Sequence, residues 1–307
     1  MTTVRKRCLN LRLDLLTATK RPRLCPISDV AATYSQGIDL LSQHEILKVL
    51  GRGDGGTVNK VRNKQTLAVY ALKIIRGDIK SSQELDILRR ISSPRIVHCH
   101  QIFEKPSGEA QILMEYMDIG TLDTYRKSHG HLCEEVIADI SRQVLKGLVY
   151  MRSKNILHHD IKPSNLLINE KMEVKIIADF GISKIVGSGT NHCNSFFGTY
   201  ASMSPERFDT VKNSEYDVYA ADAWSFGVTT MEVYVGYYPF LLQEEKTAYW
   251  LALMSAICGG EPPCLTNSSS TSQFKDFINC CLQKYPRMRW TASQLLLHPF
   301  VAEQDSV

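Results

Sequence analysis

Four side chains in the middle of the chain have the types and the order that phosphoryl transfer requires. Asp160, Lys162 and Asn165 lie in one short stretch, HHDIKPSN, and Asp179 begins an Asp-Phe-Gly triplet further on. A carboxylate such as Asp160 can orient an attacking hydroxyl and accept its proton, and Lys162 can meet the phosphate that is transferred. Asn165 and Asp179 offer oxygen atoms, the ligands that Mg²⁺ prefers. Each residue alone is more often part of a turn, but the four together predict a phosphoryl-transfer site.

A glycine-rich stretch earlier in the chain could hold the phosphates of a nucleotide. Gly51, Gly53 and Gly56 follow the spacing G-x-G-x-x-G, which lets the backbone approach phosphates closely, and Val58 offers an apolar surface for a base. An isolated glycine pattern is more often an ordinary turn. Here Lys73 follows in the stretch VYALK, which matches the motif whose lysine neutralises nucleotide phosphates. The sequence therefore predicts that the chain binds ATP.

The segment 112–117 (ILMEYM) is expected to pass along the adenine as a hinge. Main-chain groups of Glu115 and Met117 would face the base, and Ala71 and Met114 complete the expected nucleotide contacts. Core packing explains the apolar residues of this segment equally well, so only its position between two differently patterned regions favours the hinge.

The elements that must position these residues change in type along the chain. Up to about residue 117 the apolar runs are short and typical of strands, and beyond residue 120 the apolar residues recur with a helical period. The pattern predicts an α+β fold with a β-rich part followed by a helical part. The expected strands are 46–50, 57–61, 69–75, 96–103, 112–116, 165–169 and 174–178, and the expected helices include 81–91 and 136–151.

The composition is that of an ordinary globular protein. The chain has 307 residues, of which 44% are hydrophobic and 22% are charged, and its net charge of +4 is too weak to indicate nucleic acid as a partner. The longest apolar run, around residues 226–242, is interrupted by polar residues and predicts a buried helix, not a membrane span. Nine cysteines without metal-binding spacing suit reduced thiols in the cytosol or nucleus.

Four further segments carry a family resemblance: 111–118 (QILMEYMD), 197–206 (FGTYASMSPE), 222–227 (DAWSFG) and 289–296 (RWTASQLL). With the motifs above, the chain resembles a eukaryotic protein kinase from about residue 45 to 302, and within that family a plant mitogen-activated protein (MAP) kinase kinase. The resemblance implies the bilobal kinase fold. The N-lobe would span 45–117 and the C-lobe 118–302, with a flexible arm at 1–44 and a tail at 303–307.

The resemblance also implies an activity and several internal contacts. The chain would use ATP and Mg²⁺ to phosphorylate the threonine and the tyrosine in the activation loop of a MAP kinase, and an upstream kinase could activate it. Asp222 would anchor the catalytic loop, and Glu206 would form an ion pair with Arg289. The alternative is a weakly active, pseudokinase-like adaptor that docks a MAP kinase. The enzyme is favoured by the intact Lys73, Asp160, Asn165 and Asp179, and the adaptor by the short helix region, His159 and Gly189.

The N-terminal arm has the layout of a MAP kinase docking peptide, in which cations meet an acidic patch and alternate leucines fill apolar pockets. An extended backbone would place these leucines on one side. A nuclear-import cluster, a transit peptide and simple solubility are competing interpretations. The cations are Arg5, Lys6 and Arg7, and the leucines are Leu9, Leu11 and Leu13.

The activation loop departs from the family pattern. His159 replaces the arginine that normally pairs with a loop phosphate, and a histidine is mostly neutral at cytosolic pH. Ser195 is present, but the second usual acceptor position holds Gly189, flanked by Ser188 and Thr190. We therefore predict that phosphorylation of this loop activates the protein poorly.

Two spacings also depart from the family. Only eleven positions separate Lys73 from Glu84, so the helix that carries Glu84 must start late. Because Ser81 to Glu84 reads as a capping box, this carboxylate could either pair with Lys73 or cap its own helix. One residue more than usual precedes Asp179, and a β-bulge at the pair Ile176-Ile177 is expected to absorb it.

Overall fold

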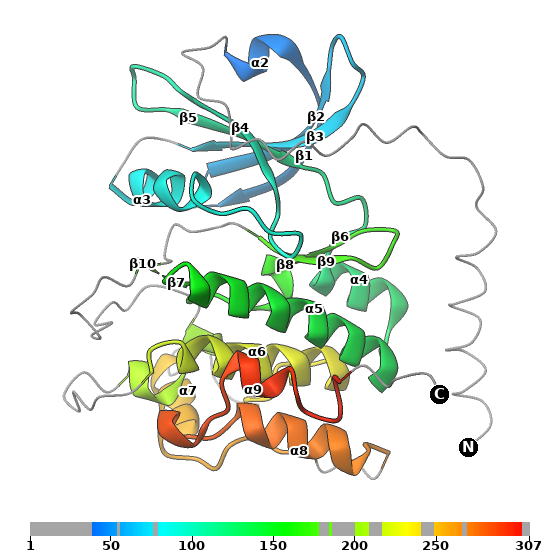
Figure 1. Cartoon of the computed structure of the whole chain (residues 1–307), viewed down its shortest axis with the longest axis vertical. Helices are drawn as coiled ribbons and strands as arrows, with labels where there is room; N and C mark the ends of the chain where they lie inside the picture. Colours follow the sequence, from blue (N-terminus) through cyan, green and yellow to red (C-terminus); the bar gives the residue numbers. More distant parts are fainter. Residues whose placement is uncertain are drawn as a thin grey trace. The chain divides into compact units, whose positions relative to one another are not determined.

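Five strands in the first part of the chain form one antiparallel sheet with the order β1-β2-β3-β5-β4 (Figure 1). The computed structural model describes residues 39–53, 56–75, 79–177, 184–185, 200–208, 217–240, 249–265 and 269–302. All five strands were predicted, β3 at its observed bounds and the other four with ends that differ by a few residues. Their bounds are His44–Gly53 (β1), Gly56–Asn63 (β2), Val69–Ile75 (β3), Cys99–Glu104 (β4) and Ala110–Glu115 (β5).

The two faces of this sheet carry different apolar clusters, because successive side chains of a strand point to opposite faces. Ala71 and Ile75 belong to the main core, together with Leu85 and Leu88 of helix α3 (Ile79–Leu88). The neighbouring Leu72 belongs to a separate small cluster, whose other buried members are Leu40, Val61 and Leu113.

Leu40 belongs to a short helix, α2 (Leu40–Gln43), in the part of the chain that was interpreted as the end of a flexible arm. The side chain of Asp39 caps this helix by accepting a hydrogen bond from the backbone N–H of Leu41 at 3.0 Å. Leu40 is fully buried. The folded part of the chain therefore includes α2 as well as β1.

Strand β1 lies at one edge of the sheet and has an unusual surface. Ile46, Leu47, Val49 and Leu50 are each at least 40% exposed. Its pairing with β2 shifts register twice, once between Ile46 and Lys48 and once between Val49 and Gly51. Such shifts mark β-bulges, which bend a strand and increase its twist.

The second part of the described chain is mainly helical (Figure 1). Helix α5 contacts α6, and α6 contacts α8. The residues of α6 are almost all buried, and Trp224 and Phe226 lie at its centre. Within the described ranges, no helix combines the length and the apolar character that a bilayer span requires. The helices are α4 (Leu122–His129), α5 (Glu134–Ser153), α6 (Ala220–Val235), α7 (Tyr249–Cys258), α8 (Ser272–Cys281) and α9 (Ala292–Leu295).

Short strands and 3₁₀ turns connect these helices and position the site. Strand β6 (Gly120–Thr121) pairs with β8 (Leu166–Ile168), which pairs with β9 (Val174–Ile176), and β7 (Ile156–Leu157) pairs with β10 (Lys184–Ile185). The 3₁₀ turns are η2 (Pro163–Asn165), η3 (Tyr200–Ser202), η4 (Pro205–Arg207) and η5 (Pro286–Met288).

The two parts are joined where the chain between α3 and β4 meets β9. The backbone N–H of Val97 donates to the carbonyl of Ile176, and the N–H of Ile176 donates to the carbonyl of Arg95, both at 3.0 Å. Gly147 of α5 allows this approach, since a Cβ there would lie 2.8 Å from Cδ1 of Ile176 and 3.3 Å from the carbonyl of Arg95. The helical part thus packs directly under the connection that leads out of α3.

Candidate active site

The register of the sheet gathers the predicted nucleotide contacts on one face. Val58 of β2 lies opposite Lys73 of β3, and Ala71 of β3 lies opposite Met114 of β5. Directly opposite residues of antiparallel strands point to the same face, and so do residues two apart. The four side chains therefore share one face, the one that α3 also covers.

A buried ion pair joins this face to α3. The Nζ of Lys73 lies 2.7 Å from Oε1 of Glu84, and both side chains are more than 90% buried. Of the two roles that the sequence left open for Glu84, the structure shows the pair with Lys73. The helix begins at Ile79, so Ser81 lies inside its first turn and is not the N-cap that the capping-box interpretation required. A lysine held in this way can neutralise the phosphates of a bound nucleotide.

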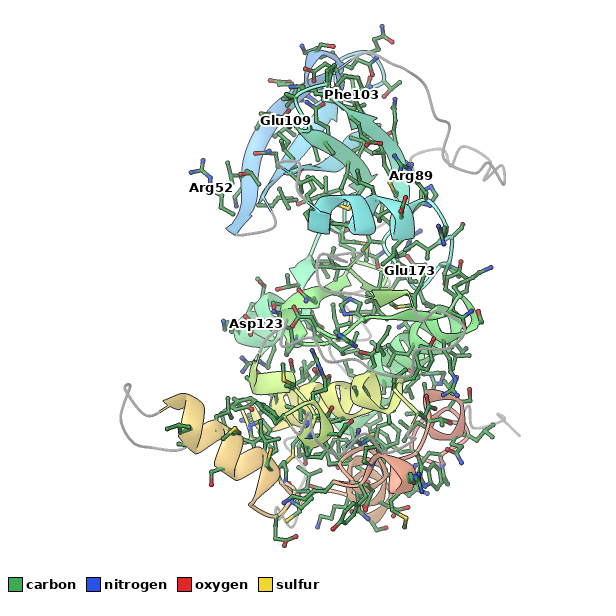
Figure 2. The ribbon with its side chains drawn as sticks, turned by 90° about the vertical axis from the view of Figure 1, so that its left-hand side faces the viewer. Arg52, Arg89, Phe103, Glu109, Asp123 and Glu173 are labelled. Atoms are coloured by element: carbon green, nitrogen blue, oxygen red, sulfur yellow. The ribbon has the colours of Figure 1, made fainter. Side chains whose placement is uncertain are left out.

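The three glycines of the glycine-rich stretch have different surroundings. Gly56 has a φ of +105°, and a Cβ there would lie 2.1 Å from the carbonyl oxygen of Ile74. A Cβ on Gly51 or Gly53 would meet no atom of the described residues within 4 Å. Between them, Arg52 points away from the sheet at the tip of β1 (Figure 2). The space beside Gly51 and Gly53 fits the close approach of a phosphate.

The residues of the predicted catalytic loop converge on one carboxylate. Oδ2 of Asp160 accepts hydrogen bonds from Nζ of Lys162 at 2.7 Å and from Nδ2 of Asn165 at 2.8 Å. The same Nδ2 also donates to the backbone carbonyl of Asp160 at 2.8 Å. Because the amide nitrogen of Asn165 faces Asp160, its oxygen points the other way, as a metal ligand must.

Asp222 of α6 holds the backbone just before Asp160, as the resemblance implied. Its two carboxylate oxygens accept hydrogen bonds from the backbone N–H groups of His158 at 2.9 Å and of His159 at 2.8 Å. Burial raises the pKa of Asp222, while His158 and these two N–H groups act in the opposite direction. His159 has a φ of +71°, a conformation that costs a residue with a side chain about 1–2 kcal/mol. Asp222 stabilises this strained turn.

His158 connects the catalytic loop to the strand that leads toward Asp179, a role that the sequence analysis did not assign. The backbone N–H of Asp160 donates to Nδ1 of His158 at 3.1 Å. Nδ1 is therefore the acceptor, and Nε2 carries the proton that it donates to the carbonyl of Ile177 at 3.1 Å. The position of His158 before the catalytic acid was visible, but its bonding depends on a backbone conformation that spacing does not reveal.

The expected hinge is also an ionic link between the two parts of the chain. The carboxylate of Glu115 accepts hydrogen bonds from Nζ of Lys175 at 2.6 and 2.7 Å and from the backbone N–H of His98 at 2.6 Å. The backbone N–H of Glu115 donates to the carbonyl of His98 at 3.0 Å. Met117 is buried. The side chain of Glu115 thus fixes the hinge against β9.

The ion pair implied between Glu206 and Arg289 is confirmed. Nη1 and Nη2 of Arg289 lie 2.8 and 3.1 Å from the two carboxylate oxygens of Glu206. Nη1 also donates to the carbonyl of Ala220 at 2.7 Å. Because the arginine side chain is fully buried, this pair fixes η4 against the start of α6.

Several predicted residues lie outside the described part of the chain: Asp179, the loop residues Ser188, Thr190 and Ser195, and the docking residues 5–7, 9, 11 and 13. The expected β-bulge is absent from the described residues, because β8 and β9 pair in regular register through Ile176. The N–H of Ile177 still donates to the carbonyl of Asn165 at 2.9 Å. The extra residue therefore does not disturb the chain up to Ile177.

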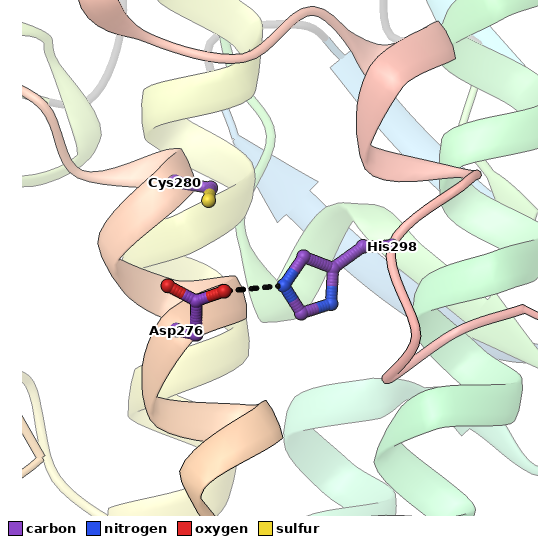
Figure 3. A group of neighbouring side chains, drawn as sticks. All are labelled: Asp276, Cys280 and His298. Carbon is purple, nitrogen blue, oxygen red and sulfur yellow. Dashed lines mark hydrogen bonds and ion pairs between the residues drawn. The ribbon is translucent and has the colours of Figure 1, made fainter.

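A second group of polar side chains, Asp276, Cys280 and His298, could be mistaken for a metal site (Figure 3). The N–H of Phe300 donates to Nδ1 of His298 at 3.1 Å, so Nε2 carries the proton and donates it to Oδ2 of Asp276 at 3.1 Å. Burial raises the pKa of the Cys280 thiol to about 11. The hydrogen bond between His298 and Asp276 ties the segment after α9 to α8.

Comparison with known proteins agrees with this geometry. The family model for the protein kinase domain matches residues 44–301. Mitogen-activated protein kinase kinase 7 of Arabidopsis thaliana is 48% identical over 99% of both chains, and kinase kinase 9 of the same plant is 47% identical over 97% of both. The kinase kinase SIPKK of Nicotiana tabacum is 37% identical over 96% of this chain and 84% of its own.

The chain therefore belongs to the protein kinase family and, within it, to the MAP kinase kinases. It is an ATP-dependent protein kinase that uses a divalent metal ion, as this family does. The resemblance stated from the sequence is confirmed, and it extends beyond residues 45–302 into the N-terminal arm, since the alignments cover nearly the whole chain.

Proposed function

We propose that this kinase transfers the γ-phosphoryl group of ATP to the threonine and the tyrosine in the activation loop of a MAP kinase. Its relatives are named mitogen-activated protein kinase kinases, a name that means kinases of MAP kinases. The observation that carries the catalytic part is the convergence of Lys162 and Asn165 on Asp160, next to a backbone that Asp222 and His158 hold in place. An adaptor without catalysis has no need of this arrangement, so the adaptor alternative is not favoured.

The residues have separate roles in the proposed reaction. The backbone at Gly51 and Gly53 covers the phosphates of ATP, and Lys73, oriented by Glu84, neutralises them. Val58, Ala71 and Met114 contact the base on the sheet face that they share, and main-chain groups of Glu115 and Met117 bind its edge. These contacts hold the phosphates at the catalytic loop.

At that loop, Asp160 orients the hydroxyl of the substrate and accepts its proton, and Lys162 stabilises the charge on the transferred phosphoryl group. Asn165 and Asp179 would hold Mg²⁺, which suits their oxygen atoms and neutralises charge on the phosphates when bound. Placing the reactants in line accounts for most of the catalysis, because little covalent chemistry is left to the protein.

Substrate choice and control lie in segments outside the described residues. The arm would bind the MAP kinase through its cations and alternate leucines. The full-length similarity to other MAP kinase kinases supports this role, because it includes the arm. Phosphorylation of Ser188, Thr190 or Ser195 by an upstream kinase would activate the enzyme weakly, since His159 offers no fixed positive charge. We propose that the protein acts mainly in the cytoplasm, with the nucleus as a second site.

Radiolabel transfer from ATP to a panel of kinase-dead MAP kinases tests the proposal. The wild type is expected to label at least one of them on threonine and tyrosine. Asp160→Asn should lower the rate by about 10²-fold or more, because it removes the proton acceptor. The control Asp139→Asn changes an exposed carboxylate on α5 and should leave the rate unchanged.

Equal labelling by the wild type and Asp160→Asn would refute catalysis and favour the adaptor. The same assay after treatment with an upstream kinase tests control by the loop. Activation of more than about tenfold that is lost in Ser195→Ala would contradict weak control.

A further inference from the structure

Arg207 is a buried arginine beside the catalytic loop that has no part in the function described so far. It is the last residue of η4, and only 7% of its surface is exposed. Its Nη1 donates a hydrogen bond to the backbone carbonyl of His159 at 3.2 Å. A buried guanidinium that bonds to the backbone next to a catalytic acid points to a role in holding that acid.

The bonded carbonyl belongs to the peptide group that joins His159 to Asp160. A peptide group is planar, so its carbonyl oxygen and its N–H move together. The oxygen accepts the hydrogen bond of Arg207, and the N–H donates to Nδ1 of His158 at 3.1 Å. With both of its polar groups bonded, this peptide has one orientation, and that orientation sets the direction in which Asp160 presents its side chain.

The backbone at this point needs such support. The φ of +71° at His159 is a conformation that a residue with a side chain keeps only when its surroundings enforce it. Asp222 bonds the N–H groups of His158 and His159, which lie on one side of the strained residue. Arg207 bonds the carbonyl on the other side. Asp222 from α6 and Arg207 from η4 therefore hold the turn from both sides.

The backbone that carries Arg207 is itself held by hydrogen bonds. Its backbone N–H donates to the carbonyl of Ser204 at 3.0 Å, which closes the turn of η4. The preceding residue, Glu206, is held by both terminal nitrogens of Arg289. A side chain that starts from such a fixed backbone can transmit its position to the carbonyl that it bonds.

We propose that Arg207 is a positioning residue that fixes the peptide between His159 and Asp160 and thereby orients Asp160 for phosphoryl transfer. This inference rests on the function proposed above, because it concerns the rate of that transfer. It gives the arginine of η4 a specific task in a catalytic loop whose own arginine position is occupied by His159.

The test compares Arg207→Met with Arg207→Lys and with the control Arg152→Met. Arg152 is 42% exposed and pairs with Asp217 away from the catalytic loop. The kcat and the KM for ATP are measured with the best MAP kinase substrate of the panel, and calorimetry with ATP counts the nucleotide sites per chain. Arg207→Met should lower kcat about tenfold while KM and the number of sites change less than about twofold.

Arg207→Lys should keep kcat within about threefold of the wild type, because its ammonium can donate to the same carbonyl. An unchanged kcat in Arg207→Met would overturn the inference, whereas a loss of nucleotide sites in proportion to kcat means that this variant does not fold. If Arg207→Met does not fold, Arg207→Ala, which also lacks a donor, replaces it, and equal kcat values for the alanine and lysine variants would overturn the inference. A wild type no faster than Asp160→Asn refutes the proposed function instead.

Discussion

The glycines of the glycine-rich stretch illustrate how one sequence motif combines two physical requirements. Gly56 is fixed by the fold itself, because its backbone lies against the carbonyl of Ile74 and its φ is positive. Gly51 and Gly53 face open space and are free of both constraints among the described residues. The close approach of a nucleotide phosphate would explain the absence of side chains at these two positions.

The different surroundings of Gly56 and Gly53 predict that alanine lowers stability at the first position and nucleotide binding at the second. Gly56→Ala should lower the free energy of unfolding by about 2 kcal/mol or more, because the new Cβ would clash with backbone and the positive φ would be strained. Gly53→Ala should leave the free energy of unfolding within about 0.5 kcal/mol and raise the KM for ATP. Urea denaturation and steady-state kinetics on both variants check this. Equal loss of stability in the two would contradict it.

The sequence predicted some contacts of the site and not others, for reasons of distance along the chain. Asp160, Lys162 and Asn165 meet because a single turn, η2, brings neighbours together. Glu84 could not be assigned, since its pairing with Lys73 depends on where α3 begins. The bonds of His158 were missed because they follow from the strained backbone beside it.

At the scale of elements, long and strongly patterned segments were predicted well. The strand 69–75 was predicted at its observed bounds, and the helix 136–151 matches α5 apart from two residues at each end. Of the short elements, strands β8 and β9 were predicted, as 165–169 and 174–178, but helix α2 was not. Helix α2 has four residues, too few for a helical period, and what stabilises it is the burial of Leu40 against β2, β3 and β5.

Leu40 therefore tests whether α2 is part of the folded unit. Leu40→Ala should lower the free energy of unfolding by about 2–4 kcal/mol, because it leaves a cavity against Val61, Leu72 and Leu113. Leu47→Ala is the matched control, since Leu47 is 40% exposed and its loss should cost less than about 0.5–1 kcal/mol. Urea denaturation measures both. A loss in Leu40→Ala no larger than in Leu47→Ala would show that α2 does not contribute.

At the scale of the whole molecule, the sheet and the helical part meet through polar contacts that neither part reveals alone. The ionic link from Glu115 to Lys175 spans sixty residues of sequence, and the backbone bonds at Ile176 reach back to the connection after α3. No pattern of residues in the sequence predicts these contacts, because they form only when both parts are folded. They join the sheet to the helical part that carries the catalytic loop.

The arm adds a prediction about recognition of a partner. Replacing Arg5, Lys6 and Arg7 with alanine should weaken binding to the cognate MAP kinase about tenfold at low salt, because these cations would meet an acidic patch. The control replaces three other cations of the arm, Lys20, Arg21 and Arg23, and removes the same charge. Calorimetric titration of the two proteins measures the affinity. Equal weakening by both triple variants would indicate general charge attraction and contradict a docking motif.

The edge strand β1 has a further consequence for how copies of this protein behave at high concentration. Exposed apolar side chains at the edge of the described sheet are a feature that leads edge strands to recruit one another into aggregates. The two register shifts divide β1 into short stretches of regular strand. A strand of a second molecule could pair with such an edge over only a few residues at a time. Despite its exposed apolar side chains, β1 is therefore a poor template for self-assembly.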